Sequence, residues 1–225
     1  MGKSMVRNLM KHGFVVRIYA RHPEKVADVA AEGAELCDSI ADCVRGSEAV
    51  ITMVGFPADV RDVYFGAENI LASAARGTYL IDMTTTSPTL SQELSRAGAE
   101  RGMRVLDAPV TGGDTGARAG TLSILVGGAR EDYETCLPLF RAMGTTINYQ
   151  GGAGCGQHAK MANQIMIAGT LSGICEALSY ARAKGLDEET LLRSVSTGAA
   201  GSRQLDLLGG KLLNADFTPG FYIKH

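Results

Sequence analysis

The sequence predicts an α/β protein in which a doubly wound parallel sheet is followed by an all-helical domain led by a long interdomain helix. Two observations support this class. Up to about residue 150, short apolar runs rich in β-branched residues alternate with amphipathic stretches, and after Gly156 no further strand-like run occurs. The predicted domain boundaries are 1–152 and 153–225.

Six segments of the first domain are predicted strands because they are short, apolar and rich in β-branched residues. They span residues 14–19, 49–54, 78–83, 103–110, 122–128 and 145–149. The amphipathic segments between them, such as 4–13, 23–33 and 87–102, are predicted helices. Near-continuous apolar strands separated by helices are typical of a parallel sheet that is covered on both faces.

The second domain is predicted to begin with one helix from Cys155 to Lys184, which Gly185 ends. Residues 165–175 within it contain no charge, and the apolar residues are not confined to one stripe. We therefore expect this helix to be buried nearly all round. A second helix follows, with Asp187 as its predicted N-cap.

Composition excludes several classes of function. Acidic and basic residues nearly cancel, 24 against 22, so nothing indicates a nucleic-acid partner. The five cysteines are scattered, which is typical of reduced thiols in the cytoplasm, and no apolar run has the length of a membrane span. The four histidines lack metal-ligand spacing, so no metal site is expected.

The first predicted helix, in "MGKSMVRNLMKHG", begins directly after a glycine. A Rossmann-type dinucleotide site would need a strand and two more glycines before Gly2. After the strand at 14–19 such a domain usually carries an acid for the ribose of NAD, whereas this chain has Ala20 and Arg21. An arginine can pair with a 2'-phosphate, which favours NADP over NAD; a solvated surface arginine is the alternative.

The segment "DAPVTGG" at 107–113 follows a predicted strand, where an open α/β sheet binds its ligands. The Thr111 hydroxyl and the backbone N–H groups of Gly112 and Gly113 are candidate ligands for a substrate carboxylate. A plain tight turn would also require the two glycines.

The long helix begins with a polar patch formed by Lys160, Asn163 and Gln164, which lie three and four residues apart and so share one face. Burial of a lysine lowers its pKa, which suits the ammonium to give up a proton near neutral pH. The alternative is a capped helix start with a lysine whose ammonium reaches solvent.

Together these segments resemble the β-hydroxyacid dehydrogenase family, which includes 3-hydroxyisobutyrate dehydrogenase and tartronate semialdehyde reductase. "MGKSMVRNLMKHG" is similar to the end of its G-x-G-x-M-G loop and first helix, "DMTTTSP" at 82–88 to its D-x-S-T-x-x-P loop, and "DAPVTGG" to its D-A-P-V-S-G-G motif. "GTLSILVGG" is similar to the glycine-rich strand that follows, and "GCGQHAKMANQ" to its G-x-x-x-K-x-x-N-[NQ] segment.

The resemblance implies that Lys160 is the catalytic lysine and that Gln164, with Asn163, helps to hold and orient the reacting groups. It implies cofactor contacts, which with Arg21 give the set Met1, Gly2, Arg21, Val54, Gly55 and Thr85. "KMANQIMIA", "GAAGS" and "FTPGF" are most similar to tartronate semialdehyde reductase. Thr111 replaces the family's serine but keeps the hydroxyl, and the chain is predicted to be truncated at both ends.

The sequence therefore predicts an oxidoreductase that transfers a hydride between NAD(P)H and a small oxo acid, with reduction of tartronate semialdehyde to glycerate as the expected reaction. The alternatives are a 3-hydroxyisobutyrate dehydrogenase, a succinic semialdehyde or glyoxylate reductase, or a non-catalytic nucleotide-binding or oligomerisation module. A relative that reduces imines or acts on 6-phosphogluconate-like acids is less favoured, because Lys160 is retained and no sugar-phosphate pocket is evident. A homo-oligomer is expected, because the long apolar helix needs additional cover.

Overall fold

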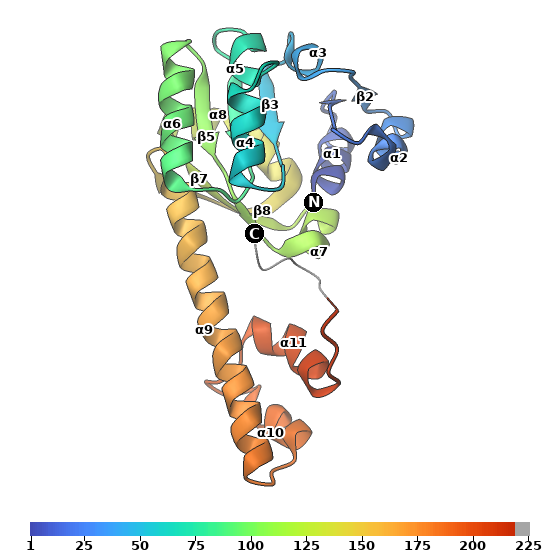
Figure 1. Cartoon of the computed structure of the whole chain (residues 1–225), viewed down its shortest axis with the longest axis vertical. Coiled ribbons are helices and arrows are strands. Elements are labelled where there is room, and N and C mark those ends of the chain that lie inside the picture. The colour runs from blue at the N-terminus through green and yellow to red at the C-terminus, as the bar shows by residue number, and fades with distance from the viewer. Residues whose placement is uncertain (219–225) are drawn as a thin grey trace. The chain divides into compact units, whose positions relative to one another are not determined.

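The computed structural model describes residues 1–218, which form two compact units, Met1–Lys160 and residues 161–218 (Figure 1). The end of the second predicted domain and the last three residues of the "FTPGF" segment lie outside the described residues. Among the residues described, no helix combines the length and the hydropathy needed to cross a membrane.

A six-stranded sheet forms the centre of the first unit. Its strands are β3 (Ala49–Thr52), β4 (Tyr79–Asp82), β5 (Arg104–Asp107), β6 (Val110–Thr111), β7 (Leu122–Gly127) and β8 (Gly144–Gly151). They lie in the order β3-β4-β5-β7-β6, and β8 pairs with β7. Strands β3, β4 and β5 are parallel and in register, so that Thr52, Asp82 and Asp107 lie side by side at the carboxyl ends.

Helices cover both faces of this sheet, as the doubly wound prediction requires (Figure 1). Leu80 and Val105 pack with helices α3 to α6 on one face, whereas their neighbours Ile81 and Leu106 pack with α1 and α8 on the other. The helices of this unit, besides the short α2, are α1 (Gly2–Lys11), α3 (Ile40–Val44), α4 (Pro57–Phe65), α5 (Ile70–Ser73), α6 (Pro88–Glu100), α7 (Gly113–Ala119) and α8 (Arg130–Met143). The predicted Rossmann-type fold is confirmed.

The sheet differs from the prediction at β7, which runs antiparallel to β5 and β6. Residues 103–110 also form two strands rather than one, with Pro109 between them. Proline has no N–H for the ladder, which explains the break. Only residues 112–121 separate β6 from β7, fewer than the dozen or more that a parallel crossover needs, so the chain returns antiparallel.

The predicted strand at 14–19 is reduced to β1 (Arg17–Ile18), which pairs in parallel with β2 (Glu35–Leu36). These two strands form a separate small sheet. A 3₁₀ turn (η1, Pro23–Lys25) and α2 (Ala27–Ala31) connect them. Val29 of α2 is fully buried and clusters with Ile18 and Ala34, so this sheet has its own small core.

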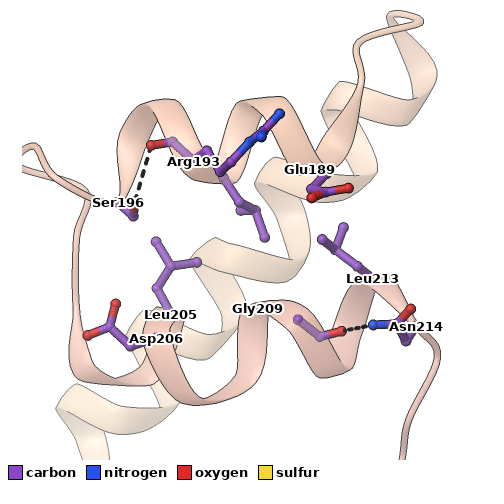
Figure 2. A pocket seen from close by; sticks show the side chains of 10 residues that line it. Glu189, Arg193, Ser196, Leu205, Asp206, Gly209, Leu213 and Asn214 are labelled. Carbon is purple, nitrogen blue, oxygen red and sulfur yellow. Dashed lines mark hydrogen bonds between the residues drawn. The ribbon is translucent and has the colours of Figure 1, made fainter.

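The long helix is confirmed as α9 (Cys155–Ala183), and Gly185 follows it with a φ of 72°. Asp187 caps α10 (Glu188–Val195) as predicted, since its carboxylate accepts the N–H of Thr190 at 2.7 Å. The last described helix is α11 (Arg203–Leu213), and α10 and α11 line a pocket of about 570 Å³ (Figure 2).

The expectation that α9 is buried nearly all round is wrong for the single chain. Ile174 and Leu178 are buried against Leu205 of α11, whereas Ile165 and Met166 are 66% and 67% exposed. The cause is geometric, because two short helices cover only one face of a long one within the described part of this unit.

Candidate active site

The carboxyl ends of β3 and β4 are joined by a buried hydrogen-bond network. The Thr52 hydroxyl donates to Asp82 Oδ1 at 2.8 Å, and the Tyr64 hydroxyl lies 3.2 Å from Thr52 Oγ1. Asp82 is 1% exposed, and its Oδ2 has no hydrogen-bond partner among residues 1–218. Burial raises the pKa of Asp82 to about 6, although its hydrogen bonds oppose this shift.

This network also fixes the two loops that follow the strands. The backbone N–H of Thr84 donates to Asp82 Oδ1 at 3.1 Å, and the Thr84 hydroxyl accepts the N–H of Val54 at 3.0 Å. Val54, Gly55 and Thr85 are thereby brought together, although they are about thirty residues apart in the chain. Backbone at the carboxyl edge of a parallel sheet is where a dinucleotide binds in this fold class.

The raised pKa of Asp82 predicts a pH dependence of stability. In the folded protein Asp82 keeps its proton up to about pH 6, whereas its ordinary pKa, expected in the unfolded chain, is 3.8. The stability that protonated Asp82 contributes is therefore fully present below pH 3.8 and is lost as the pH rises through 6. Asp82→Asn should therefore remove about 3 kcal/mol of decline in unfolding free energy between about pH 4 and 7. Urea titrations at several pH values measure this slope. The control Asp62→Asn, at an exposed position of α4, should keep the wild-type slope of unfolding free energy against pH. An unchanged slope in Asp82→Asn would contradict the raised pKa of Asp82.

Asp107, at the end of β5, holds the first turn of α9. Its Oδ1 accepts the N–H of Gly154 at 2.8 Å, and its Oδ2 accepts the N–H of Gln157 at 3.0 Å. Burial raises the pKa of Asp107, and the backbone N–H groups partly offset this effect. A carboxylate at a helix N-terminus satisfies donors that otherwise lack intrahelical partners and interacts favourably with the helix dipole. The start of α9 is thus attached to the same sheet edge as Asp82.

Lys160 follows one turn after Gln157 on α9 and is 8% exposed. Desolvation alone lowers its pKa, and within residues 1–218 no hydrogen bond or ion pair joins its ammonium to another side chain. A desolvated, unpaired ammonium gives up a proton more readily than a solvated one. Asn163 and Gln164 follow on the same helix, where Asn163 Nδ2 donates to Gln164 Oε1 at 2.9 Å.

The predicted carboxylate loop contains two glycines in the left-handed half of backbone space. Gly112 has a φ of 121° and Gly113 a φ of 63°, conformations that residues with a Cβ rarely adopt. Thr111 ends β6, opposite Ser123 of β7, and α7 begins at Gly113. The turn therefore requires its glycines on conformational grounds. The first N–H groups of a helix such as α7 have no acceptor within the helix.

Met1 and Gly2 lie beside this loop. The Met1 nitrogen is 3.7 Å from Asp114 Oδ1, and both residues line a pocket of about 720 Å³ at the N-terminus of α1. Its lining residues are Met1, Gly2, Lys3, Ser4, Arg7, Lys25, Val26, Asp114 and Arg118. A helix N-terminus with several cationic side chains fits a bound pyrophosphate.

Arg21 is placed differently from the other predicted cofactor residues. Its guanidinium is 63% exposed and forms an ion pair with Asp59 Oδ1 at 2.7 Å. Asp59 also accepts the N–H of Phe56 at 2.9 Å, so the carboxylate is fixed at the start of α4. Arg21 therefore lies close to the β3–α4 loop that contains Val54 and Gly55.

Comparison with known proteins shows the family of the chain. The NAD binding domain of 6-phosphogluconate dehydrogenase matches residues 1–152, and the family described as NAD-binding of NADP-dependent 3-hydroxyisobutyrate dehydrogenase matches residues 154–225. The chain belongs to the β-hydroxyacid dehydrogenase family. It is an NAD(P)-dependent oxidoreductase, and the residues at the sheet edge and at the N-terminus of α1 suit such a cofactor.

Relatives of this dehydrogenase cover the whole chain. The chain is 48% identical to the uncharacterized oxidoreductase YkwC of Bacillus subtilis over 100% of its own length and 78% of the relative. It is 35% identical to 2-hydroxy-3-oxopropionate reductase of Escherichia coli over 99% of the chain and 76% of the relative. The structure of Mycobacterium tuberculosis 3-hydroxyisobutyrate dehydrogenase with L-serine superposes with a TM-score of 0.90 and 32% identity, covering 98% of this chain and 77% of that one.

Sequence reasoning missed three polar residues of the dehydrogenase that the structure brings to this edge, namely Asp82, Asp107 and Gln157. Each is at most 3% exposed and hydrogen-bonded to a loop or helix start that contains a predicted site residue. The two acids could have been found from the sequence, because each follows the apolar residues of a buried strand and lies at its carboxyl end. Gln157 had none, because its partners lie 71 and 73 residues away in the sequence.

Proposed function

We propose that this dehydrogenase interconverts a small hydroxy acid and the corresponding oxo acid, with reduction of tartronate semialdehyde to glycerate as its reaction. The proposal depends on the ammonium of Lys160, which is buried and has no ion-pair partner in the described part of the chain. The E. coli 2-hydroxy-3-oxopropionate reductase, at 35% identity, supports this substrate.

In the proposed mechanism, the nicotinamide cofactor supplies the hydride when bound. Lys160 gives its proton to the oxygen that becomes the alcohol, and in oxidation the neutral amine takes that proton back. The Thr111 hydroxyl and the N–H groups of Gly112 and Gly113 bind the substrate carboxylate, and Asn163 and Gln164 orient the reacting groups. The low exposure of Lys160 limits competing proton exchange with water.

The substrate class is tested by steady-state turnover of the full chain with NADPH and tartronate semialdehyde, compared with oxidation of 3-hydroxyisobutyrate and L-serine. The solved 3-hydroxyisobutyrate dehydrogenase with L-serine favours the second candidate function, oxidation of these hydroxy acids. The highest kcat/KM for tartronate semialdehyde supports the first proposal. A preference for either hydroxy acid supports the second, and NADPH binding without any turnover would leave a non-catalytic nucleotide-binding module.

We further propose NADP rather than NAD as the preferred cofactor, with Arg21 pairing with the 2'-phosphate. Arg21→Ala should then raise the KM for NADPH about tenfold and leave the KM for NADH within about twofold, since a hydrogen bond to a charged group contributes roughly 1.5–3 kcal/mol. Arg45→Ala, which removes another exposed arginine that pairs with an aspartate, should change neither value. Equal effects of Arg21→Ala on both cofactors would contradict this role.

We also propose that the protein forms a homo-oligomer and lies in the cytoplasm. Met161, Ile165 and Met166 of α9 are 57%, 66% and 67% exposed, which supports association of copies along this helix. The five free cysteines support a reducing compartment. Light scattering after gel filtration tests the association, and a monomer of 23.7 kDa would contradict it.

A further inference from the structure

We propose that Gln157 is a positioning residue whose side-chain amide fixes the loop of Thr85 to the turn of α9 that precedes Lys160. The proposal rests on the proposed function, in which Lys160 transfers the proton and Thr85 contacts the cofactor. Gln157 Oε1 accepts the N–H of Thr86 at 3.0 Å, and its Nε2 donates to the carbonyl of Thr84 at 2.8 Å. The two bonds therefore hold Thr85 from both sides.

The chemistry of an amide suits this position. One partner is a donor and the other an acceptor, and a glutamine presents one acceptor atom and one donor atom on a single planar group. Gln157 is 2% exposed, so water does not replace either bond without a rearrangement. A carboxylate would keep the bond to Thr86 but place an oxygen against the Thr84 carbonyl, and a thioether would lose both bonds.

A residue of the sheet also holds Gln157 in place. Its backbone N–H donates to Asp107 Oδ2 at 3.0 Å, and the far end of the loop is held by Asp82, which accepts the N–H of Thr84 at 3.1 Å. The loop is thus fixed to β4 by one residue and to α9 by another. Lys160 lies three residues after Gln157, on the same side of the helix.

This arrangement sets the spacing between the cofactor loop and the proton donor. Hydride and proton transfer depend strongly on alignment, and a displacement of about 1 Å can lower a rate roughly 10²-fold. The substrate-carboxylate loop at Thr111 makes no bond to Gln157 in the described structure. Loss of the amide should therefore impair the chemical step more than substrate binding.

The test compares Gln157→Met with the wild type in the full chain. Gln157→Met should lower kcat about 100-fold, leave the KM of the oxo acid within about threefold, and raise the isotope effect with deuterated NADPH because hydride transfer becomes rate-limiting. Gln157→Glu, which retains the size and one bond, should give an intermediate kcat. Gln150→Met, the same exchange at an exposed residue of β8, should match the wild type.

A merely structural role gives a different result. It would lower kcat only in proportion to the folded fraction and would leave the isotope effect unchanged, which would overturn the proposal. If Gln157→Met does not fold, the same comparison is made with Gln157→Glu. Hydrogen exchange of the segment 84–88 provides a readout without turnover: faster exchange in the variant is expected, and equal exchange overturns the proposal even if the wild type proves inactive. Wild-type inactivity alone would instead contradict the proposed function.

Discussion

Lys160→Ala should lower kcat by about 10² to 10⁴-fold, the range expected when a general acid is removed. Lys160 is buried and has a pKa lowered by desolvation, which suits its ammonium to give up a proton. The dissociation constant of NADPH should change little, because the pyrophosphate site proposed at the N-terminus of α1 does not include Lys160.

Stopped-flow or steady-state kinetics and a fluorescence titration with NADPH measure the two quantities separately. Lys11→Ala, which removes an exposed lysine at the end of α1, serves as the control and should retain wild-type turnover. Near-normal kcat in Lys160→Ala would rule out this lysine as the proton donor. A parallel loss of NADPH binding would instead indicate that the substitution disturbs the fold.

Gly156→Ala should lower the free energy of unfolding by about 3 kcal/mol or more, the upper part of the range for overpacking. A Cβ at this position would overlap the carbonyl oxygen of Leu125 and lie 2.6 Å from the carbonyl oxygen of Asp107. Both atoms belong to the backbone of the sheet and cannot turn aside as a flexible side chain can. The start of α9 would have to move away from β5 and β7, and Lys160 would move with it.

Gly152→Ala is the matched control for this substitution, because no atom of the described residues lies within 4 Å of its Cβ position. Urea denaturation should give a lower midpoint for Gly156→Ala and a midpoint close to wild type for Gly152→Ala. Equal midpoints for the two variants would show that α9 does not pack against the sheet as closely as the structure has it.

The fold could be predicted from local patterns because each element has a period and a boundary of its own. The expected strands 49–54, 78–83 and 122–128 correspond to β3, β4 and β7, and the predicted α9 and its glycine stop agree with the structure. The direction of β7 could not be predicted in the same way. Strand direction depends on which partner the chain reaches through its connection, and composition carries little information on that.

Some features of the candidate site could likewise be predicted from local sequence, and others could not. Lys160 could be found from the sequence because a lysine shortly before the uncharged run 165–175 is locally unusual. Gly112 and Gly113 could be found because their spacing after a strand indicates a turn or ligand loop. The ion pair of Arg21 with Asp59 could not be predicted from the sequence, because Asp59 is distant in the chain and an exposed charge such as that of Arg21 has many potential partners.

The sequence by itself determined the doubly wound class, the family and the residue types available for proton transfer, because periodicity and motifs are properties of contiguous residues. Only the tertiary structure decided how those residues are held. Asp82, Asp107 and Gln157 each bond to a residue between 30 and 73 positions away, and these hydrogen bonds exist only once β3, β4, β5 and α9 meet at one sheet edge. Burial then shifts the pKa values of Asp82, Asp107 and Lys160, because desolvation depends on surrounding atoms from the whole unit rather than on neighbours in the chain.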